Sequence, residues 1–500
     1  MTSEEEVIRL RQENRALRER IQLLEEQLRV LSEQGQMQEE QAKKRQAVQE
    51  QELGQLKEQV QGLEERLKKD SHNSHLPPSS DRFHRQPKSL RKPSDKPAGG
   101  QKGHPGSTLM LSPTPDEVIV HGVEACVHCH GELRAVESLQ VERRQVIDLP
   151  PKRVVVIEHQ AEQKQCPVCQ QISTGAFPDD VRAAVQYSAA FGAVGVYLVQ
   201  QQFLPYERAC EVIQDLLGPT MSVGTLQAMV QRCAAALEPV EAHLKAALSR
   251  AAVLHQDETG LYVAGKRSWL HVSATDHLTH YQVHPKRGQQ ALEAIAILAS
   301  FEEVSVHDGW SSYWRYPCQH ALCNVHHLRE LTFLHEEQHL AWAEEMKTLL
   351  LDGKAAVEEA RAAGRAQLHP LELADWQEQY EQLLEEGYLT TPPDPPPQAQ
   401  KRGRRKQSPA RNLLDRLCTH QEAVLAFLTN FAVPFDNSQA ERDIRMVKVQ
   451  QKVSGCFRSL PGAQAFCRIR SYLSTLRKQG VPVLLALEQA LSGHPVFPAF

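Results

Sequence analysis

Apolar side chains recur with a period of seven along residues 5–33. One seam of this heptad is Leu10, Leu17, Leu24 and Leu31, and the other is Val7, Asn14, Ile21 and Leu28. This pattern predicts a leucine zipper, in which one buried Asn fixes the register of two strands. The alternative is a lone amphipathic helix. The pattern is lost over residues 34–50 and returns at Leu53 in a shifted frame, so we do not expect one continuous straight coil.

A polar segment follows at residues 71–115. It has few large apolar side chains, and between Arg82 and Lys102 it has seven Lys or Arg and one acid, Asp95. Such a segment buries too little apolar surface to fold by itself. We expect either a solvated linker or a disordered basic arm that contacts phosphates.

Residues 116–180 contain two Cys-x-x-Cys pairs, Cys126 with Cys129 and Cys166 with Cys169. The β-rich stretch between the pairs predicts a hairpin over residues 139–149 and 152–158. Four thiolates brought together in this way form a tetrahedral, structural Zn²⁺ site.

The other bulk features fit a metal-binding protein of the cytoplasm. The chain has eleven cysteines, an acidic start without an apolar leader, and a net charge of only -5. Cysteines in a large cytosolic chain favour metal binding over disulfides. The longest nearly apolar run, residues 189–199, is about half the length of a membrane-spanning helix, so we expect no membrane association.

Residues 181–247 have the apolar spacing of helices, with a break at Gly218-Pro219-Thr220. A helix, a turn with glycine and a second helix is the order of a helix-turn-helix DNA reader. The second helix has one base, Arg232, so ordinary helical packing is an equal alternative.

Residues 253–306 predict three strands, a helix and a fourth strand. The segments are 253–254, 268–273, 278–283, 288–298 and 304–306. This order matches the start of a ribonuclease-H-like fold, in which the first and fourth strands are neighbours. We expect Asp257 and Asp308 to close these two strands and therefore to lie side by side.

A helical insertion at about 332–434 interrupts this domain. Its loop contains the bases Lys401, Arg402, Arg404 and Arg405, which either contact the DNA backbone or belong to a solvated linker. Just before the insertion, Cys318, Cys323 and His326 suggest a second metal site. No fourth ligand is obvious, and buried thiols are the simpler explanation.

Glu441 begins a basic segment, with nine Lys or Arg and one acid from Arg442 to Lys478. Two aspartates with this glutamate form an acidic set that suits two Mg²⁺ ions in phosphodiester-cutting enzymes. Asp436 and Asp443 compete for the third place, and Ser438-Gln-Ala-Glu441 is also a capping box. The bases expected to bind DNA here are Arg445, Lys448, Lys452 and Arg458.

Together these residues resemble the transposases of insertion-sequence family sixty-six, which are bacterial DDE transposases. The resemblance covers nearly the whole chain, including the zipper and both cysteine pairs. Its motifs are Pro77–Asp81, Gly99–His104, Asp257–Gly260, His307–Trp310, Cys323–Glu330, Asp436–Arg442, Ser454–Ser459 and Arg470–Lys478.

The resemblance implies Mg²⁺-dependent hydrolysis at element ends and transfer of the freed 3′-hydroxyl into target DNA. It assigns the catalytic and Mg²⁺-binding triad to Asp257, Asp308 and Glu441. It also implies terminal inverted repeats and target DNA as partners, accessory proteins of the element, and action at the bacterial nucleoid. We expect a homodimer or higher oligomer through the zipper. The alternatives are a zinc-dependent DNA-binding protein and a domesticated, inactive transposase.

The sequence therefore predicts a multidomain α/β protein with a ribonuclease-H-like catalytic domain. The expected parts are a coiled coil (1–70), a basic linker (71–115), a zinc domain (116–180), a helical region (181–247), the catalytic domain with its insertion (248–450) and a basic helical segment (451–500).

Overall fold

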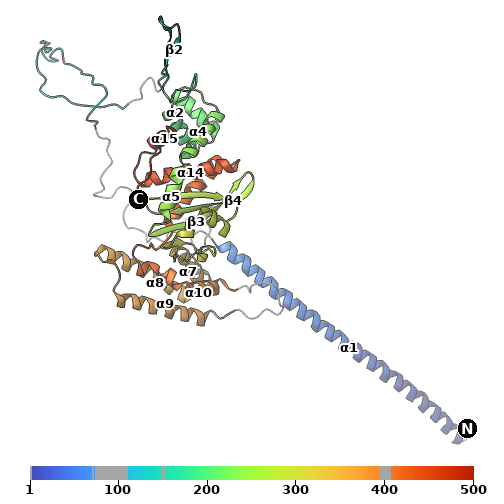
Figure 1. The fold of residues 1–500 in the computed structure, drawn as a ribbon. Helices are drawn as coiled ribbons and strands as arrows, with labels where there is room; N and C mark the ends of the chain where they lie inside the picture. The colour runs from blue at the N-terminus through green and yellow to red at the C-terminus, as the bar shows by residue number, and fades with distance from the viewer. Residues whose placement is uncertain (1–2, 70–72, 74–110, 148–153, 394–406) are drawn as a thin grey trace. The chain divides into compact units, whose positions relative to one another are not determined.

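The computed structural model describes residues 3–69, 73, 111–147, 154–393 and 407–500. The chain divides into two compact units, residues 1–90 and 91–500 (Figure 1). Most of the predicted linker lies outside the described residues, as do Lys401, Arg402, Arg404 and Arg405.

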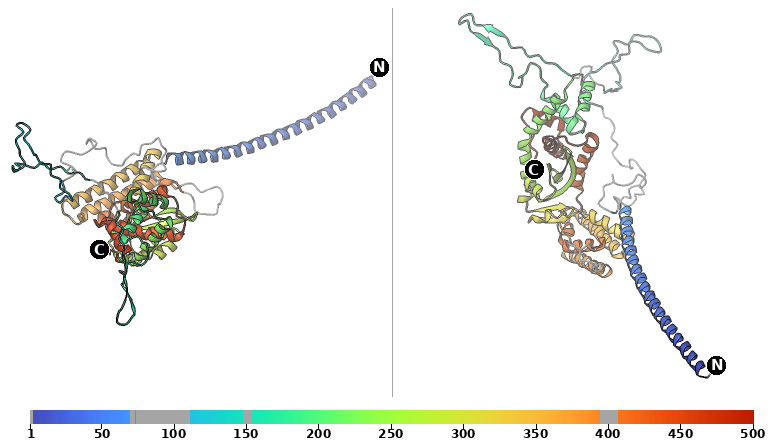
Figure 2. Two further views of the ribbon diagram at one scale, coloured as in Figure 1. Left: turned by 90° about the horizontal axis from the view of Figure 1, so that it is seen from above. Right: turned by 90° about the vertical axis from the view of Figure 1, so that its right-hand side faces the viewer.

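The first unit contains one long helix, α1 (Ser3–Lys68), which curves gently in Figure 2. It is rich in Glu, Gln, Arg and Leu, which are good helix formers, and ion pairs such as Arg9–Glu13 join successive turns. The helix continues through residues 34–50, because helix propensity does not depend on the heptad frame. Leu28 of the predicted seam is 67% exposed, so pairing of this helix in a zipper stays a prediction.

Residues 111–147 and 154–187 have little regular structure. Their described strands are β1 (Gln163–Gln165) and β2 (Ile172–Thr174), an antiparallel pair on either side of the second cysteine pair. The hairpin predicted between the two pairs is wrong for the described residues, because residues 139–147 and 154–158 form no strand. Apolar side chains there, such as Val141, are exposed, and strands without a covering layer are only marginally stable.

A five-stranded sheet is the centre of the second unit. Its strands are β3 (Val253–Val263), β4 (Lys266–Ala274), β5 (Thr279–His284), β6 (Val304–His307) and β7 (Gln319–Leu322). Their order is β5-β4-β3-β6-β7, with β6 parallel to β3 and β7 and the other pairs antiparallel. The first and fourth strands are neighbours, as predicted, and the crossover between β5 and β6 contains α6 (Gln289–Ile295).

β3 is longer than predicted, so Asp257 lies within the strand rather than at its end. It pairs with Val272 of β4. The two strands extend as a hairpin because Ala264 and Gly265 both adopt positive φ, at 49° and 73°, the backbone of a tight two-residue hairpin turn. The parallel pairing with β6 is short and ends at His255.

Helices that are distant in sequence share one core with this sheet. α2 (Ala189–Gln200) packs against α15 (Val483–Leu491), and α14 (Leu460–Lys478) packs against β5 and α4 (Val223–Ala236), with α5 (Glu238–Leu248) beside them. Figure 1 shows α14 and α15 next to α2 and α4. The segment 451–500 is therefore packed with residues 181–247 in one apolar core.

The predicted helix-turn-helix order is present in α3 (Tyr206–Leu217) and α4. Gly218 joins them with φ 98°. One face of α4 is buried through Leu226 and Met229, whereas Arg232 is exposed. DNA reading by α4 stays a prediction.

The insertion is helical and has its own apolar core, around Trp342 and Tyr380. It consists of α7 (Asn324–Gln338), α8 (Ala341–Ala362), α9 (Pro370–Thr390), α10 (Pro409–Thr419), α11 (Gln421–Val424) and α12 (Ala426–Thr429). α13 (Ser438–Ser454) then returns the chain to β3 and β4. No helix in the described ranges has the length and apolar character needed to span a membrane.

Candidate active site

Asp257 and Asp308 lie together at one end of the β3–β6 pair. The register places His255 opposite Val306, and β6 ends at His307. Two residues beyond this pair, Asp257 on β3 stands level with Asp308. Strand order therefore brings together two acids that are far apart in sequence.

The carboxyl of Asp257 is surrounded by other acids. Burial raises the pKa of Asp257 well above its usual range, and the charges of Glu258, Asp308 and Glu441 raise this pKa further. A 2.8 Å hydrogen bond from the Glu258 backbone N–H to Asp257 Oδ1 has the opposite effect. The other two predicted acids, Asp308 and Glu441, thus both act on the charge of Asp257.

Glu441 lies in the first turn of α13. Burial raises the pKa of its carboxyl, and the charges of Asp436 and Asp308 add to this effect, whereas Arg329 and Arg445 oppose it. The capping-box alternative is wrong. The residue that caps α13 is Asn437 rather than Ser438, and it makes no side-chain cap bond.

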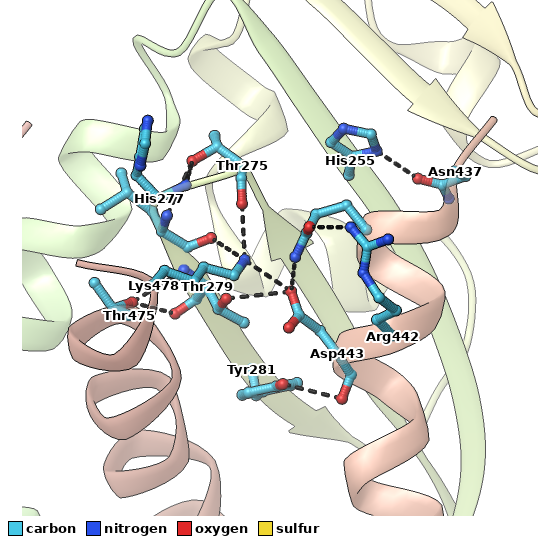
Figure 3. A network of polar contacts seen from close by, with 12 residues as sticks. His255, Thr275, His277, Thr279, Tyr281, Asn437, Arg442, Asp443, Thr475 and Lys478 are labelled. Carbon is cyan, nitrogen blue, oxygen red and sulfur yellow. Dashed lines mark hydrogen bonds and ion pairs between the residues drawn. The ribbon is translucent and has the colours of Figure 1, made fainter. Parts of the chain in front are cut away.

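Asn437 instead connects three elements of the site. Its Nδ2 donates a 2.7 Å hydrogen bond to the carbonyl oxygen of Gln256. Its Oδ1 lies 2.9 Å from His255 Nδ1, as Figure 3 shows. Its backbone N–H donates to Cys323 Sγ at 3.2 Å. This buried side chain fixes the start of α13 relative to β3, next to Asp257.

Asp443 is committed to a structural contact. Its carboxylate accepts hydrogen bonds from Thr279 at 3.2 Å and from Gln439 and Lys478 at 3.0 Å (Figure 3). These bonds join α13 to β5 and α14. Asp443 is therefore poorly suited to be the third metal ligand.

Asp436 remains a competitor for that place. Its Oδ1 accepts a 2.9 Å hydrogen bond from the Ser438 backbone N–H. With His255 and Arg442 it also lines a cavity of about 410 Å³ beside β3. Its charge contributes to the raised pKa of Glu441, so the two acids are close enough to interact.

The sequence prediction missed Glu258. Its side chain is 2% exposed and accepts from Arg287 at 2.7 Å and from the Tyr313 hydroxyl at 2.5 Å. Burial raises the pKa of Glu258, and the charge of Asp308 raises it further. The guanidinium of Arg287 also lies 3.7 Å from the centre of the Trp310 ring. The only signal in the sequence was the acid directly after Asp257, in a motif that resembles a turn.

Two histidines form a chain of hydrogen bonds next to Asp308 in sequence. The Gly309 backbone N–H donates to His307 Nδ1 at 3.0 Å, so this nitrogen carries no proton. His307 Nε2 therefore carries the proton and donates to His320 Nδ1 at 3.0 Å, and His320 Nε2 donates to the Tyr316 carbonyl oxygen at 3.1 Å. Burial lowers the pKa of His307 to about 3, which keeps this directed chain neutral.

Another group of possible ligands lies beside the triad. Cys323, His326 and Glu441 each have a ligand atom within 4.8 Å of the other two, and they are the one such group of three among the described residues. The three acids of the predicted triad, Asp257, Asp308 and Glu441, do not form a group this tight. Ligands of two ions about 4 Å apart are spread around both ions rather than gathered at one point.

Each cysteine pair forms a separate knuckle, and the two knuckles share the same pattern of backbone hydrogen bonds. Cys126 N–H donates to Gly131 and Cys166 N–H to Gln171, both at 2.8 Å. In each knuckle, backbone N–H groups of the following residues, above all that of the second cysteine, lower the pKa of the first thiol. Such donors favour the thiolate, the form that binds zinc. The thiols of the two pairs, Cys126 with Cys129 and Cys166 with Cys169, are not gathered around one centre in the structure.

The bases predicted to bind DNA differ in their surroundings. Arg445, Lys452 and Arg458 are exposed on or just after α13. Lys448 is also exposed, but its ammonium donates a 2.9 Å hydrogen bond to the Gly260 carbonyl oxygen, and partial burial lowers the pKa of this lysine. Lys448 thus braces α13 against β3.

Residues 184–465, more than half of the chain, match the model of the Transposase IS66 family. The chain belongs to the IS66 transposase family. Residues 124–170 of this transposase match the zinc-finger binding domain of transposase IS66, so both cysteine pairs belong to a zinc-binding domain. Residues 2–109 match a family of unknown function. No curated protein matches the chain.

Proposed function

We propose that this transposase is a DDE enzyme that hydrolyses phosphodiester bonds at element ends and transfers the freed 3′-hydroxyl into target DNA. Asp257, Asp308 and Glu441 are the acids that hold Mg²⁺. The observation that carries this proposal is the placement of the acids: the β3–β6 register puts Asp257 level with Asp308, and Glu441, in the first turn of α13, is close enough for its charge to raise the pKa of Asp257. The strand order β5-β4-β3-β6-β7 supports a ribonuclease-H-like domain.

The donor set fits Mg²⁺, which prefers oxygen ligands. When bound at such a site, two Mg²⁺ ions activate the attacking oxygen and stabilise the leaving oxygen. Without a cation, burial raises the pKa of both Asp257 and Glu441, and the charges of the neighbouring acids raise both further. The chain's own contribution is to hold the acids in place. Asn437 fixes the helix of Glu441, and Arg287 fixes Glu258 beside Asp257.

DNA binding in this proposal uses the exposed bases near the acids. Arg445 lies one helical turn after Glu441, and Lys452 and Arg458 extend the exposed basic surface along α13 and beyond it. Phosphate contacts of this kind position the duplex without reading its sequence. The proposal also includes terminal repeats as the substrate, dimerisation through α1, accessory proteins of the element and action in the bacterial cytoplasm.

The test is cleavage of labelled element-end DNA in Mg²⁺. The variants Asp257→Asn, Asp308→Asn and Glu441→Gln should fall to background while still binding the DNA. Asp352→Asn is the matched control, because this acid is exposed on α8 of the helical insertion. Inactivity of the wild type with intact DNA binding would favour a zinc-dependent DNA-binding protein or an inactive copy. Loss of activity in Asp436→Asn but not in Glu441→Gln would reassign the third acid.

A further inference from the structure

We propose a thiophilic metal site at Cys323, His326 and Glu441, which binds Zn²⁺ or a similar ion independently of the zinc-finger domain. The inference goes beyond the proposed DDE chemistry, since it requires neither DNA nor cleavage. It rests on the 4.8 Å gathering of one sulfur, one imidazole nitrogen and one carboxylate oxygen.

Two helix starts build this cluster. Cys323 caps the N-terminus of α7, and His326 follows three residues later, so both side chains lie on the same face of the first turn. Glu441 comes from the first turn of α13. Two hydrogen bonds hold the helix starts together: the Asn437 backbone N–H donates to the Cys323 side-chain Sγ at 3.2 Å, and the Asn324 backbone N–H donates to the Phe435 carbonyl oxygen at 3.1 Å.

The donor types select the class of ion. A thiolate, an imidazole and a carboxylate suit Zn²⁺, whereas Mg²⁺ prefers oxygen alone. Three protein ligands leave a fourth tetrahedral position for water, as in open zinc sites. Cys323 is 1% exposed, but the side chains of His326 and Glu441 are 18% and 30% exposed, which gives the ion a path from solvent.

The spacing of the donors also suits an ion between them. His326 Nε2 lies 4.0 Å from Glu441 Oε1, which is longer than a hydrogen bond. Ligand atoms around a tetrahedral Zn²⁺ lie roughly 3.3–3.8 Å apart, given zinc–ligand distances of about 2.0–2.3 Å. A closure of about 1 Å brings the cluster to that geometry.

Of the two nearby buried cysteines, only Cys323 belongs to the proposed metal site. Both Cys318 and Cys323 are buried, but Cys318 is not in the group and is part of the apolar core. The third ligand, Glu441, is more than a hundred residues away in sequence and also belongs to the acidic triad. A thiophilic ion at this site therefore occupies a carboxylate that the Mg²⁺ centre uses in the proposed function.

The test uses the full chain with the four finger cysteines replaced by serine, which removes the competing thiolates of the knuckles. Cobalt(II) is the probe, because a thiolate ligand gives it a sulfur-to-metal charge-transfer band. We expect a single-thiolate band that saturates at one thiolate-bound Co²⁺ per chain. Adding Cys323→Ser should abolish the band, and adding Cys318→Ser, the matched control, should leave it unchanged. Absence of the band before Cys323 is replaced, or its persistence afterwards, would overturn the proposal.

A second pair of variants covers the case in which Cys323→Ser does not fold. His326→Gln and Glu441→Gln, in partly exposed side chains, should each weaken Co²⁺ binding at least tenfold while the thiolate band remains at saturation. Unchanged affinity in both variants would rule out this ligand set. Since the readout is metal binding without DNA, an inactive transposase does not affect the result.

Discussion

The side chain of Asn437 donates a 2.7 Å hydrogen bond to the backbone carbonyl oxygen of Gln256, the residue before Asp257. This bond connects the helix that carries the third acid of the proposed triad to the strand that carries the first. Asn437 also faces His255 through its Oδ1 and is 2% exposed. It acts on the site by position, without being one of the acids itself.

We predict that Asn437→Ala lowers the rate of DNA cleavage more than it lowers DNA affinity. Without the amide, α13 is no longer fixed to β3, and misplacement of a catalytic group by about 1 Å costs on the order of a hundredfold in rate. The buried Gln256 carbonyl also loses its partner, which costs about 1–3 kcal/mol of unfolding free energy. Single-turnover cleavage, DNA-binding affinity and thermal unfolding separate the three effects.

The control is Asn430→Ala, in an exposed asparagine outside the site. It should leave both the cleavage rate and the DNA affinity unchanged. Equal rates for wild type and Asn437→Ala would mean that Glu441 is positioned by other contacts.

Burial of Asp257 next to other acids leads to a prediction for stability in the absence of DNA. The folded-state pKa of Asp257 lies above its unfolded value, so ionised Asp257 destabilises the fold once the pH exceeds the unfolded pKa. Asp257→Asn should therefore raise the melting temperature at neutral pH without Mg²⁺. It should also remove the increase that Mg²⁺ produces in the wild type.

Thermal unfolding with and without Mg²⁺ measures both effects. Asp352→Asn, at an exposed acid of α8, should behave like the wild type. A wild-type melting temperature that does not respond to Mg²⁺ would argue against metal binding by these acids.

The strand order followed from the sequence, but the site did not follow completely. Alternating strands, a crossover helix and another strand leave few topologies, so β3 and β6 were correctly predicted as neighbours. Asp257 was misplaced at the end of its strand, because the motif looked like a turn and the Ala264–Gly265 hairpin turn comes later. The role of Asn437 depends on contacts across 181 residues, which no local pattern contains.

The bases of residues 442–478 show a second limit of sequence patterns. Arg468 pairs with Glu241 at 2.6 Å, and Lys478 pairs with Asp443 at 3.0 Å. Arg470 is 4% exposed and bonds to Gln201 at 2.6 Å. Charge density along the chain predicts a DNA-binding segment, but 12 of the 19 residues of its second helix, α14, are buried, because exposure depends on tertiary packing.

Substitution of exposed and of buried basic residues tests which of them bind DNA and which stabilise the fold. Arg445→Gln and Lys452→Gln, both exposed, should weaken binding to DNA of any sequence, and each should reduce the salt dependence of log affinity by about one unit. Arg470→Gln should instead lower the unfolding free energy, on the order of 1–3 kcal/mol, because it leaves buried partners unpaired.

Binding isotherms at several salt concentrations, together with urea unfolding, distinguish these outcomes. Arg365→Gln, in an exposed base of the helical insertion, is the control for a general loss of positive charge. An unchanged salt slope in both exposed variants would exclude the α13 surface from the DNA contact.

The hydrogen-bonded pair of His307 and His320 predicts how the free energy of unfolding depends on pH. The pKa of His307 is lowered to about 3 in the folded state by burial, whereas the unfolded value is about 6.5. The unfolded state therefore binds the extra proton between these values, so the contribution of His307 is present above pH 6.5 and is lost as the pH falls towards 3. The expected slope is roughly 1.4 kcal/mol per pH unit for one group.

Protonation of His307 also breaks the directed chain, because Nδ1 accepts the Gly309 N–H that shapes the Asp308 turn. We predict that His307→Gln makes the unfolding free energy fall less steeply as the pH falls, by roughly 1.4 kcal/mol per pH unit. Urea unfolding between pH 4 and pH 7 measures this slope. His277→Gln, at an exposed histidine, should leave the slope unchanged. If His307→Gln keeps the wild-type slope, the acid sensitivity comes from the other buried histidines, of which His271, with its pKa lowered to about 4 mainly by burial, is the next to replace.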